Sequence, residues 1–197
     1  MGEGPVEDHI AHAAGFATVL SAVAGDETGP ILDLGSGGGL PGLVLAFHFP
    51  EREIVLLDGS VRRTEWLRLA VAVCGLADQV DVVTGRAEVV AHDPLHRVRY
   101  AAVVARSFGS PSVTAECGSA FLRVGGALVV SEPPEPALDR WPAEALEVIG
   151  LRPASTHAVA GGHFQVLHAE HRCPDRYPRR TGVPGKRPLY HVHGRSS

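Results

Sequence analysis

The residues best suited to chemistry in this 197-residue sequence lie in a glycine-rich segment that begins at Asp33. It reads Asp-Leu-Gly-Ser-Gly-Gly-Gly and follows a short apolar run. Glycines let a backbone adopt positive φ and approach a ligand closely, and a helix after such a loop presents unpaired N–H groups. A second carboxylate, Asp58, lies 21 residues beyond Gly37, where it can accept hydrogen bonds from both ribose hydroxyls. The pattern predicts a nucleoside-binding site.

The spacing of the glycines separates two kinds of nucleoside cofactor. The dinucleotide pattern G-x-G-x-x-G starting at Gly35 requires a glycine at the position of Leu40. The spacing D-x-G-x-G-x-G instead resembles the first motif of class I methyltransferases, which implies S-adenosylmethionine, with Asp33 orienting its methionine end. By the same resemblance, Ala87 and Glu88 stand where the adenine ring is contacted. The alternatives are a purely structural turn for the loop and, for Glu88, a surface acid favoured by the helix dipole.

A regular alternation of strands and helices must position these residues. Apolar runs predict strands at 31–34, 53–58, 79–83, 100–105 and 127–130. Helices are predicted at 10–20, 41–49, 61–74, 86–90 and 111–122. Such alternation favours an open, mostly parallel sheet with helices on both faces. The predicted fold class is therefore a doubly wound, Rossmann-like α/β sheet, to which the resemblance to class I methyltransferases gives seven strands.

The pattern loosens near the C-terminus. Gly125 and Gly126 are expected to form a turn, 132–136 a proline-rich loop and 137–149 a helix. A strand at 163–170, in a hairpin-like region, is expected to supply an antiparallel edge. Prolines, glycines and arginines from residue 173 onward argue against a packed element. We expect one domain over 1–172, with 1–28 as a helical lead-in, and a separate tail over 173–197.

The tail concentrates positive charge. Residues 171–197 hold seven Arg and Lys against one acid, so this part is +6 and the remainder -10 of a formal net charge of -4. Such a tail can neutralise RNA phosphates, and Tyr177 can stack on a base. A flexible, solubilising end is the alternative.

Several segments together resemble one family, the glucose-inhibited division protein B group, whose members methylate N7 of a guanine in bacterial 16S ribosomal RNA. They are residues 33–42, 56–58 with Arg62, Arg63 and Leu67, 85–88, 105–108 and 177–189. The Leu-Pro-Gly continuation of the glycine loop and the tail are the most specific of these. The resemblance implies ribosomal RNA or the small ribosomal subunit as partner. No general base would be needed, because the N7 lone pair is already available for attack.

The resemblance also assigns roles to basic residues. Arg62, Arg86 and Arg106 match basic positions that line the family's active site, and solvated surface charge is the alternative for each. Arg62 and Arg106 are expected to position the substrate, because guanidinium donors pair with guanine O6 and with phosphate. The residues expected to bind the cofactor are Asp33, Gly35, Ser36, Gly37, Gly39, Leu40, Asp58, Gly59, Ala87, Glu88 and Arg106.

Two features depart from the family pattern. Only 32 residues precede Asp33, where members carry a longer helical portion that contributes to the RNA-facing surface. Glu132 and its neighbours stand where the family has a Lys-Gly pair, so an acid replaces a cation. These features keep two alternatives open: a methyltransferase of the same fold acting on a small molecule or another RNA, and a non-catalytic protein that binds S-adenosylmethionine.

Composition narrows the remaining function classes. Three cysteines, Cys74, Cys117 and Cys173, are too few and too scattered for a disulfide framework or a paired zinc site. The histidines lack metal-ligand spacing, so no metal is expected. The apolar stretches fall short of the roughly 20 residues that span a bilayer, and the N-terminus is acidic, unlike a signal peptide. We expect a cytoplasmic protein without a membrane partner.

Overall fold

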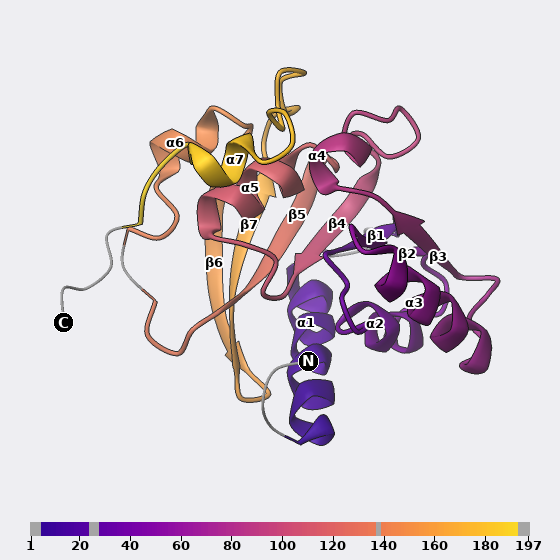
Figure 1. Cartoon of the computed structure of the whole chain (residues 1–197). Coiled ribbons are helices and arrows are strands. Elements are labelled where there is room, and N and C mark those ends of the chain that lie inside the picture. Colours follow the sequence, from indigo (N-terminus) through magenta and orange to yellow (C-terminus); the bar gives the residue numbers. More distant parts are fainter. Residues whose placement is uncertain (1–4, 24–27, 137–138, 193–197) are drawn as a thin grey trace.

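The sheet of this protein has seven strands in the order β3-β2-β1-β4-β5-β7-β6 (Figure 1). A computed structural model describes residues 5–23, 28–136 and 139–192. Strands β1 to β5 are parallel, and β7 runs antiparallel to both of its neighbours. This arrangement confirms the predicted doubly wound fold with an antiparallel edge. The strands are β1 Ile31–Leu34, β2 Ile54–Asp58, β3 Val80–Thr84, β4 Tyr100–Ala105, β5 Leu122–Glu132, β6 Leu151–Val159 and β7 Gly162–Ala169.

Helices cover both faces of the sheet because successive strand residues point to opposite sides. On β1, Ile31 packs into one apolar cluster and Leu32 into the other. The first cluster lies under α1 Val6–Val23, α2 Gly42–His48 and α3 Val61–Val73. The second lies under α4 Ala87–Val90, α5 Pro111–Ser119, α6 Ala143–Glu147 and the segment that carries α7 Val183–Lys186 (Figure 1).

The connections diverge on the two sides of β1. Asp33 on β1 pairs with Leu56 of β2 on one side and with Val104 of β4 on the other. The helix that follows β1, α2, covers one face of the sheet, and the helix that follows β4, α5, covers the other. The loops after these neighbouring strands therefore leave the sheet in opposite directions and open a crevice at its carboxyl edge, which is where open α/β sheets bind ligands. This is the point where the glycine loop and Arg106 meet.

Strand β5 is longer than the sequence indicated. The helix predicted over 111–122 ends at Ser119, and the predicted turn at Gly125 and Gly126 lies inside β5. Leu122 pairs with Tyr100 and Ala127 with Ala102, so the residues between them form an irregularity in the ladder. Gly125 has φ +86°, a backbone conformation that glycine adopts without steric cost.

The region after β5 also differs from the prediction. The helix expected over 137–149 is reduced, among described residues, to α6, and residues 137–138 lie outside the described part. Pro142 restricts the preceding residue to extended backbone, so a helix begins only after it. Strand β6 was not predicted, because only Leu151 in it is buried, most of its other residues are small or polar, and the register shifts just after Pro153.

The expectation that residues beyond 173 form no packed element is wrong. Cys173 and Tyr177 are buried against the sheet face that carries α4 and α5. Arg97, whose side chain is 10% exposed, donates to the backbone carbonyls of Cys173, Pro174 and Tyr177. We call residues 173–192 the C-terminal strap. No helix in the described part of the chain has the length and apolar character needed to cross a membrane.

Candidate active site

The glycine loop folds back on β2 and leaves its backbone open to a ligand. Gly35, Gly37 and Gly39 all have positive φ, at 77°, 55° and 93°. A Cβ on Gly35 would lie 2.6 Å from a ring carbon of Phe108, so this position excludes any side chain. The Ser36 hydroxyl donates to the backbone oxygen of Asp33 at 2.9 Å and closes the turn. The loop is therefore a fixed cradle.

Asp58 ties the end of β2 to this loop. One carboxylate oxygen accepts the Gly37 N–H at 2.9 Å, and the other accepts the Ser60 N–H at 2.8 Å. The Arg63 guanidinium lies 3.6 Å from the first of these oxygens. A carboxylate offers about four lone-pair positions, so capacity remains for two hydroxyl donors. This geometry fits a ribose.

Asp33 lies beneath the loop and does not line the cavities described below. It is 1% exposed, and its carboxylate accepts the N–H of Gly42 at the start of α2. Burial raises the pKa of Asp33 to about 7, against the opposing effects of the hydrogen bonds from Gly42 and Ser36 and of the Arg106 charge. Asp33 thus positions the loop from below, and its predicted contact with a cofactor stays a prediction.

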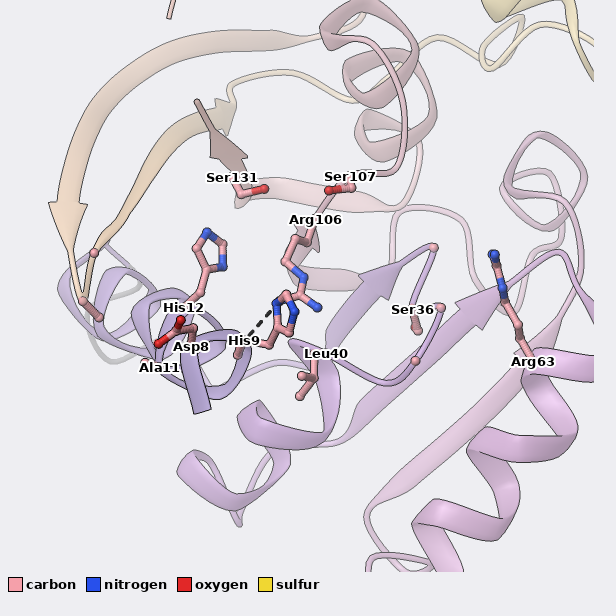
Figure 2. A pocket seen from close by; sticks show the side chains of 15 residues that line it. Asp8, His9, Ala11, His12, Ser36, Leu40, Arg63, Arg106, Ser107 and Ser131 are labelled. Carbon is pink, nitrogen blue, oxygen red and sulfur yellow. Dashed lines mark hydrogen bonds between the residues drawn. The ribbon is translucent and has the colours of Figure 1, made fainter. Parts of the chain in front are cut away.

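A cavity of about 700 Å³ opens beside the loop (Figure 2). Arg106 rises into it from the end of β4, and the guanidinium donates to the backbone oxygen of His9 at 3.4 Å. Burial lowers the pKa of Arg106, while the nearby Asp33 charge opposes the shift. The lining residues are Asp8, His9, Ala11, His12, Gly35, Ser36, Gly37, Gly38, Leu40, Arg63, Arg106, Ser107, Ser131, Ala160 and Gly161.

Helix α1 supplies a wall that the sequence did not indicate. His12 stands between Arg106 and the β6–β7 turn, close to Phe164 (Figure 2). Its Nδ1 is buried and has no hydrogen-bond partner. Burial, together with the Arg106 and His9 charges, lowers the pKa of His12, which favours the neutral imidazole. Only the fold brings this helix to the crevice, since nothing in its local pattern marks a site.

A second cavity, of about 130 Å³, lies on the other side of Gly35. It is lined by Gly35, Leu57, Asp58, Gly59, Gly85, Arg86, Ala87, Glu88, Phe108, Val113 and Cys117. Most of the residues expected around ribose and adenine are therefore brought together. Phe108 was not among them, although it lines this cavity and its ring packs against Gly35.

Glu88 connects the second cavity to the C-terminal strap. Its carboxylate is 7% exposed and accepts the Gly182 N–H at 3.0 Å and the Arg86 guanidinium at 3.3 Å. Burial alone would raise the pKa of Glu88, but these hydrogen bonds outweigh it and the pKa lies below its ordinary value. The interpretation of Glu88 as a solvated helix-end acid is therefore wrong.

The arginines divide between sites. Arg106 lines the first cavity and Arg86 the second, whereas Arg62 is exposed on α3 and borders neither. Arg63, its neighbour in sequence, lines the first cavity instead. Successive residues differ by about 100° around a helix, so Arg62 and Arg63 point in different directions, and the role of Arg62 in positioning the substrate stays a prediction.

Two further expectations are corrected by the packing. Glu132 does not present an uncompensated acid to the crevice, because it is held by the Arg140 guanidinium and by the Trp141 indole N–H at 3.0 Å. Tyr177 is 8% exposed and is not available to stack on a base. In the described part of the chain, no group of three His, Cys, Asp or Glu side chains could hold a metal ion.

Comparison with known proteins identifies the family. The family model described as GidB, rRNA small subunit methyltransferase G, matches residues 6–133. The chain belongs to this family. Ribosomal RNA small subunit methyltransferase G of Rubrobacter xylanophilus is 37% identical over 82% of this chain and 65% of that protein. Its counterpart in Deinococcus deserti is 35% identical over 89% of this chain and 75% of that protein. The chain thus spans about two thirds to three quarters of these relatives.

Solved structures agree on the fold. Geranyl diphosphate C-methyltransferase from Streptomyces coelicolor, in complex with Mg²⁺, geranyl diphosphate and S-adenosyl-L-homocysteine, superposes with a TM-score of 0.61 at 12% identity, over 80% of each chain. The antibiotic-resistance methyltransferase Kmr gives a TM-score of 0.56 at 15% identity, over 77% of this chain and 92% of that chain. These likenesses establish the class I methyltransferase fold.

Proposed function

We propose that this protein transfers a methyl group from S-adenosylmethionine to N7 of a guanine in 16S ribosomal RNA. Family membership supports the reaction, and one observation in the site carries it. The two cavities both border Gly35, so a cofactor that spans this glycine would have one end in each of them. The residues that line the smaller cavity suit an adenosine, and the larger cavity leaves room for the methionine end and a methyl acceptor.

The residues present fit the cofactor. Asp58 retains two unused acceptor positions for ribose hydroxyls, and the second cavity continues from it to Ala87 and Glu88. Gly35 and Gly37 allow the cofactor to contact the loop backbone without Cβ atoms in the way. When bound, S-adenosylmethionine supplies an electrophilic methyl group on a sulfonium centre.

On the acceptor side, the site has only to orient the guanine, because N7 carries a free lone pair and no proton has to be removed from it. Arg106 extends into the larger cavity with guanidinium donors that suit guanine O6 or a phosphate oxygen. Holding the acceptor in line with the methyl group makes the transfer effectively unimolecular, which is the main source of rate for such a reaction. Arg106 is therefore proposed as a substrate-positioning residue.

Glu132 is compatible with this proposal. The Lys-Gly pair of the family is absent, but Arg140 and Trp141 satisfy both Glu132 oxygens. Burial raises the pKa of Glu132, while Arg140 and Trp141 oppose the shift. The crevice therefore loses a cation relative to the family pattern without gaining an exposed negative charge.

Two measurements test the proposal. Calorimetric titration should detect binding of S-adenosylhomocysteine and not of NAD, because Leu40 breaks the dinucleotide pattern. Transfer of a labelled methyl group should be observed to naked 16S RNA or to assembled small subunits. Transfer only to a metabolite extract would assign a small-molecule substrate, and cofactor binding without any transfer would leave a non-catalytic binding protein.

A further inference from the structure

An exposed tryptophan stands beside the glycine loop on α3. The Trp66 side chain is 66% exposed, although tryptophan is among the residues that are most buried on average. It borders a third cavity, of about 580 Å³, between the loop and the first turns of α3. The lining residues are Gly37, Gly38, Ser60, Arg62, Arg63, Trp66, Leu67 and Ala70.

This cavity is continuous with the active-site cavity. Gly37, Gly38 and Arg63 line both. Figure 2 places Arg63 across the glycine loop from Arg106, on the side toward α3. A chain that enters the active-site cavity at Arg106 and leaves it over the loop therefore passes Arg63 and reaches the indole of Trp66.

The chemistry of this surface matches a nucleotide. Arg62 and Arg63 are both exposed and place two positive charges next to the indole, with Arg63 64% exposed. A flat aromatic surface flanked by guanidinium groups binds single-stranded nucleic acid by base stacking and phosphate contact. Leu69 and Val73 extend apolar surface farther along α3, which would also suit a second copy of this chain. The paired charges and the continuity with the active site favour RNA.

We propose that Trp66 stacks on an unpaired base next to the target guanine, while Arg62 and Arg63 hold the adjoining phosphates. This inference rests on the proposed function. It gives Arg62 a role outside the active-site cavity, and it assigns base stacking to α3, since Tyr177 is buried.

The test compares Trp66→Ala and Trp66→Phe with Phe47→Ala, which removes an equally exposed aromatic side chain, 62% exposed, on α2 outside this cavity. The KM for a 16S RNA transcript should rise at least about fivefold in Trp66→Ala, because a stacked base contributes roughly that much or more to affinity. Trp66→Phe should recover most of the loss, and Phe47→Ala should behave as wild type. The Kd for S-adenosylhomocysteine should stay within about twofold in all three.

Fluorescence provides a second readout. Of the two tryptophans, Trp141 is 9% exposed, so a short single-stranded RNA should quench mainly Trp66. Quenching should disappear in Trp66→Phe. If the wild type methylates RNA and Trp66→Ala has the same KM, the stacking role of Trp66 is wrong and the proposed function stands. A wild-type dimer that dissociates in Trp66→Ala, with unchanged KM, would assign the surface to self-association. A wild type that methylates no RNA would instead refute the proposed function.

Discussion

Substitution of Arg179 by alanine should destabilise the protein through a buried ion pair 63 residues apart in the chain. Arg179 donates to Glu116 of α5 through its backbone N–H at 2.8 Å and through two guanidinium nitrogens at 2.9 and 2.6 Å. The Glu116 side chain is 0% exposed and the Arg179 side chain 27% exposed. The variant keeps only the backbone donor, so a carboxylate is left buried without its cation.

The magnitude follows from that uncompensated charge. Removing one partner of a buried ion pair costs roughly 3–5 kcal/mol, much more than the net value of the pair itself. For a domain of this size each kcal/mol lowers Tm by about 2–4 °C, which gives a decrease of roughly 6–20 °C. Glu116→Gln in the Arg179→Ala background should recover most of this loss, because no buried charge then remains.

Urea and thermal denaturation of the four proteins in this double-mutant cycle measure the effect. Arg180→Ala, which removes an exposed arginine next to the pair, is the matched control and should change stability by less than about 0.5 kcal/mol. If Arg179→Ala costs less than about 1 kcal/mol, or if the two single effects add in the double variant, the account of a buried, desolvated pair is wrong.

Three other predictions concern the loop and the crevice. Gly35→Ala should weaken S-adenosylhomocysteine binding at least about tenfold in calorimetry, because its Cβ would meet Phe108 at 2.6 Å; Gly75→Ala, at φ +69° in open space, is the control and should leave that affinity unchanged. Asp33→Asn should flatten the pH dependence of stability. The folded-state pKa of about 7 lies above the unfolded value of about 3.9, so the stabilisation is complete below about pH 4 and lost as pH rises through about 7. Urea denaturation at pH 5 and pH 7 measures the free energy of unfolding. An equal decrease between these pH values in the wild type and in Asp33→Asn would contradict the prediction. Arg106→Gln should lower kcat/KM for 16S RNA about tenfold or more, as expected for a lost charge-assisted hydrogen bond, with a smaller change in S-adenosylhomocysteine affinity; equal losses would place Arg106 on the cofactor side.

The parts of the site that the sequence predicted are those fixed by local backbone chemistry. The glycine loop and Asp58 each follow a strand whose apolar run is unambiguous, and β1 and β4 have the predicted bounds. Parallel strands bring their carboxyl ends to one edge, so residues that follow different strands meet there. That rule also located Arg106 correctly, although it comes 48 residues after Asp58.

The parts that the sequence did not predict depend on contacts between distant segments. His12 reaches the crevice only because α1 packs against β5, β6 and β7. Local composition made the C-terminal strap resemble a disordered tail, since its stability comes from acceptors and donors supplied elsewhere, such as Arg97 and Glu116. These partners are distant in the sequence, so the composition of the segment does not reveal them. A proline-rich, basic segment without such partners would remain unfolded.

The strap changes how the positive charge near the C-terminus relates to function. Arg179 is committed to Glu116, and Arg172 pairs with Asp175 at 3.0 Å, so net charge overstates what these residues can offer to RNA phosphates. The same strap donates the Gly182 N–H to Glu88 in the cavity assigned to adenosine. Removal of the strap would expose the buried carboxylate of Glu116 and would also take the Gly182 hydrogen bond away from Glu88. Loss of RNA methylation on truncation would therefore not identify an RNA contact, whereas neutralising exposed arginines one at a time separates electrostatic contact with RNA from support of the cofactor site.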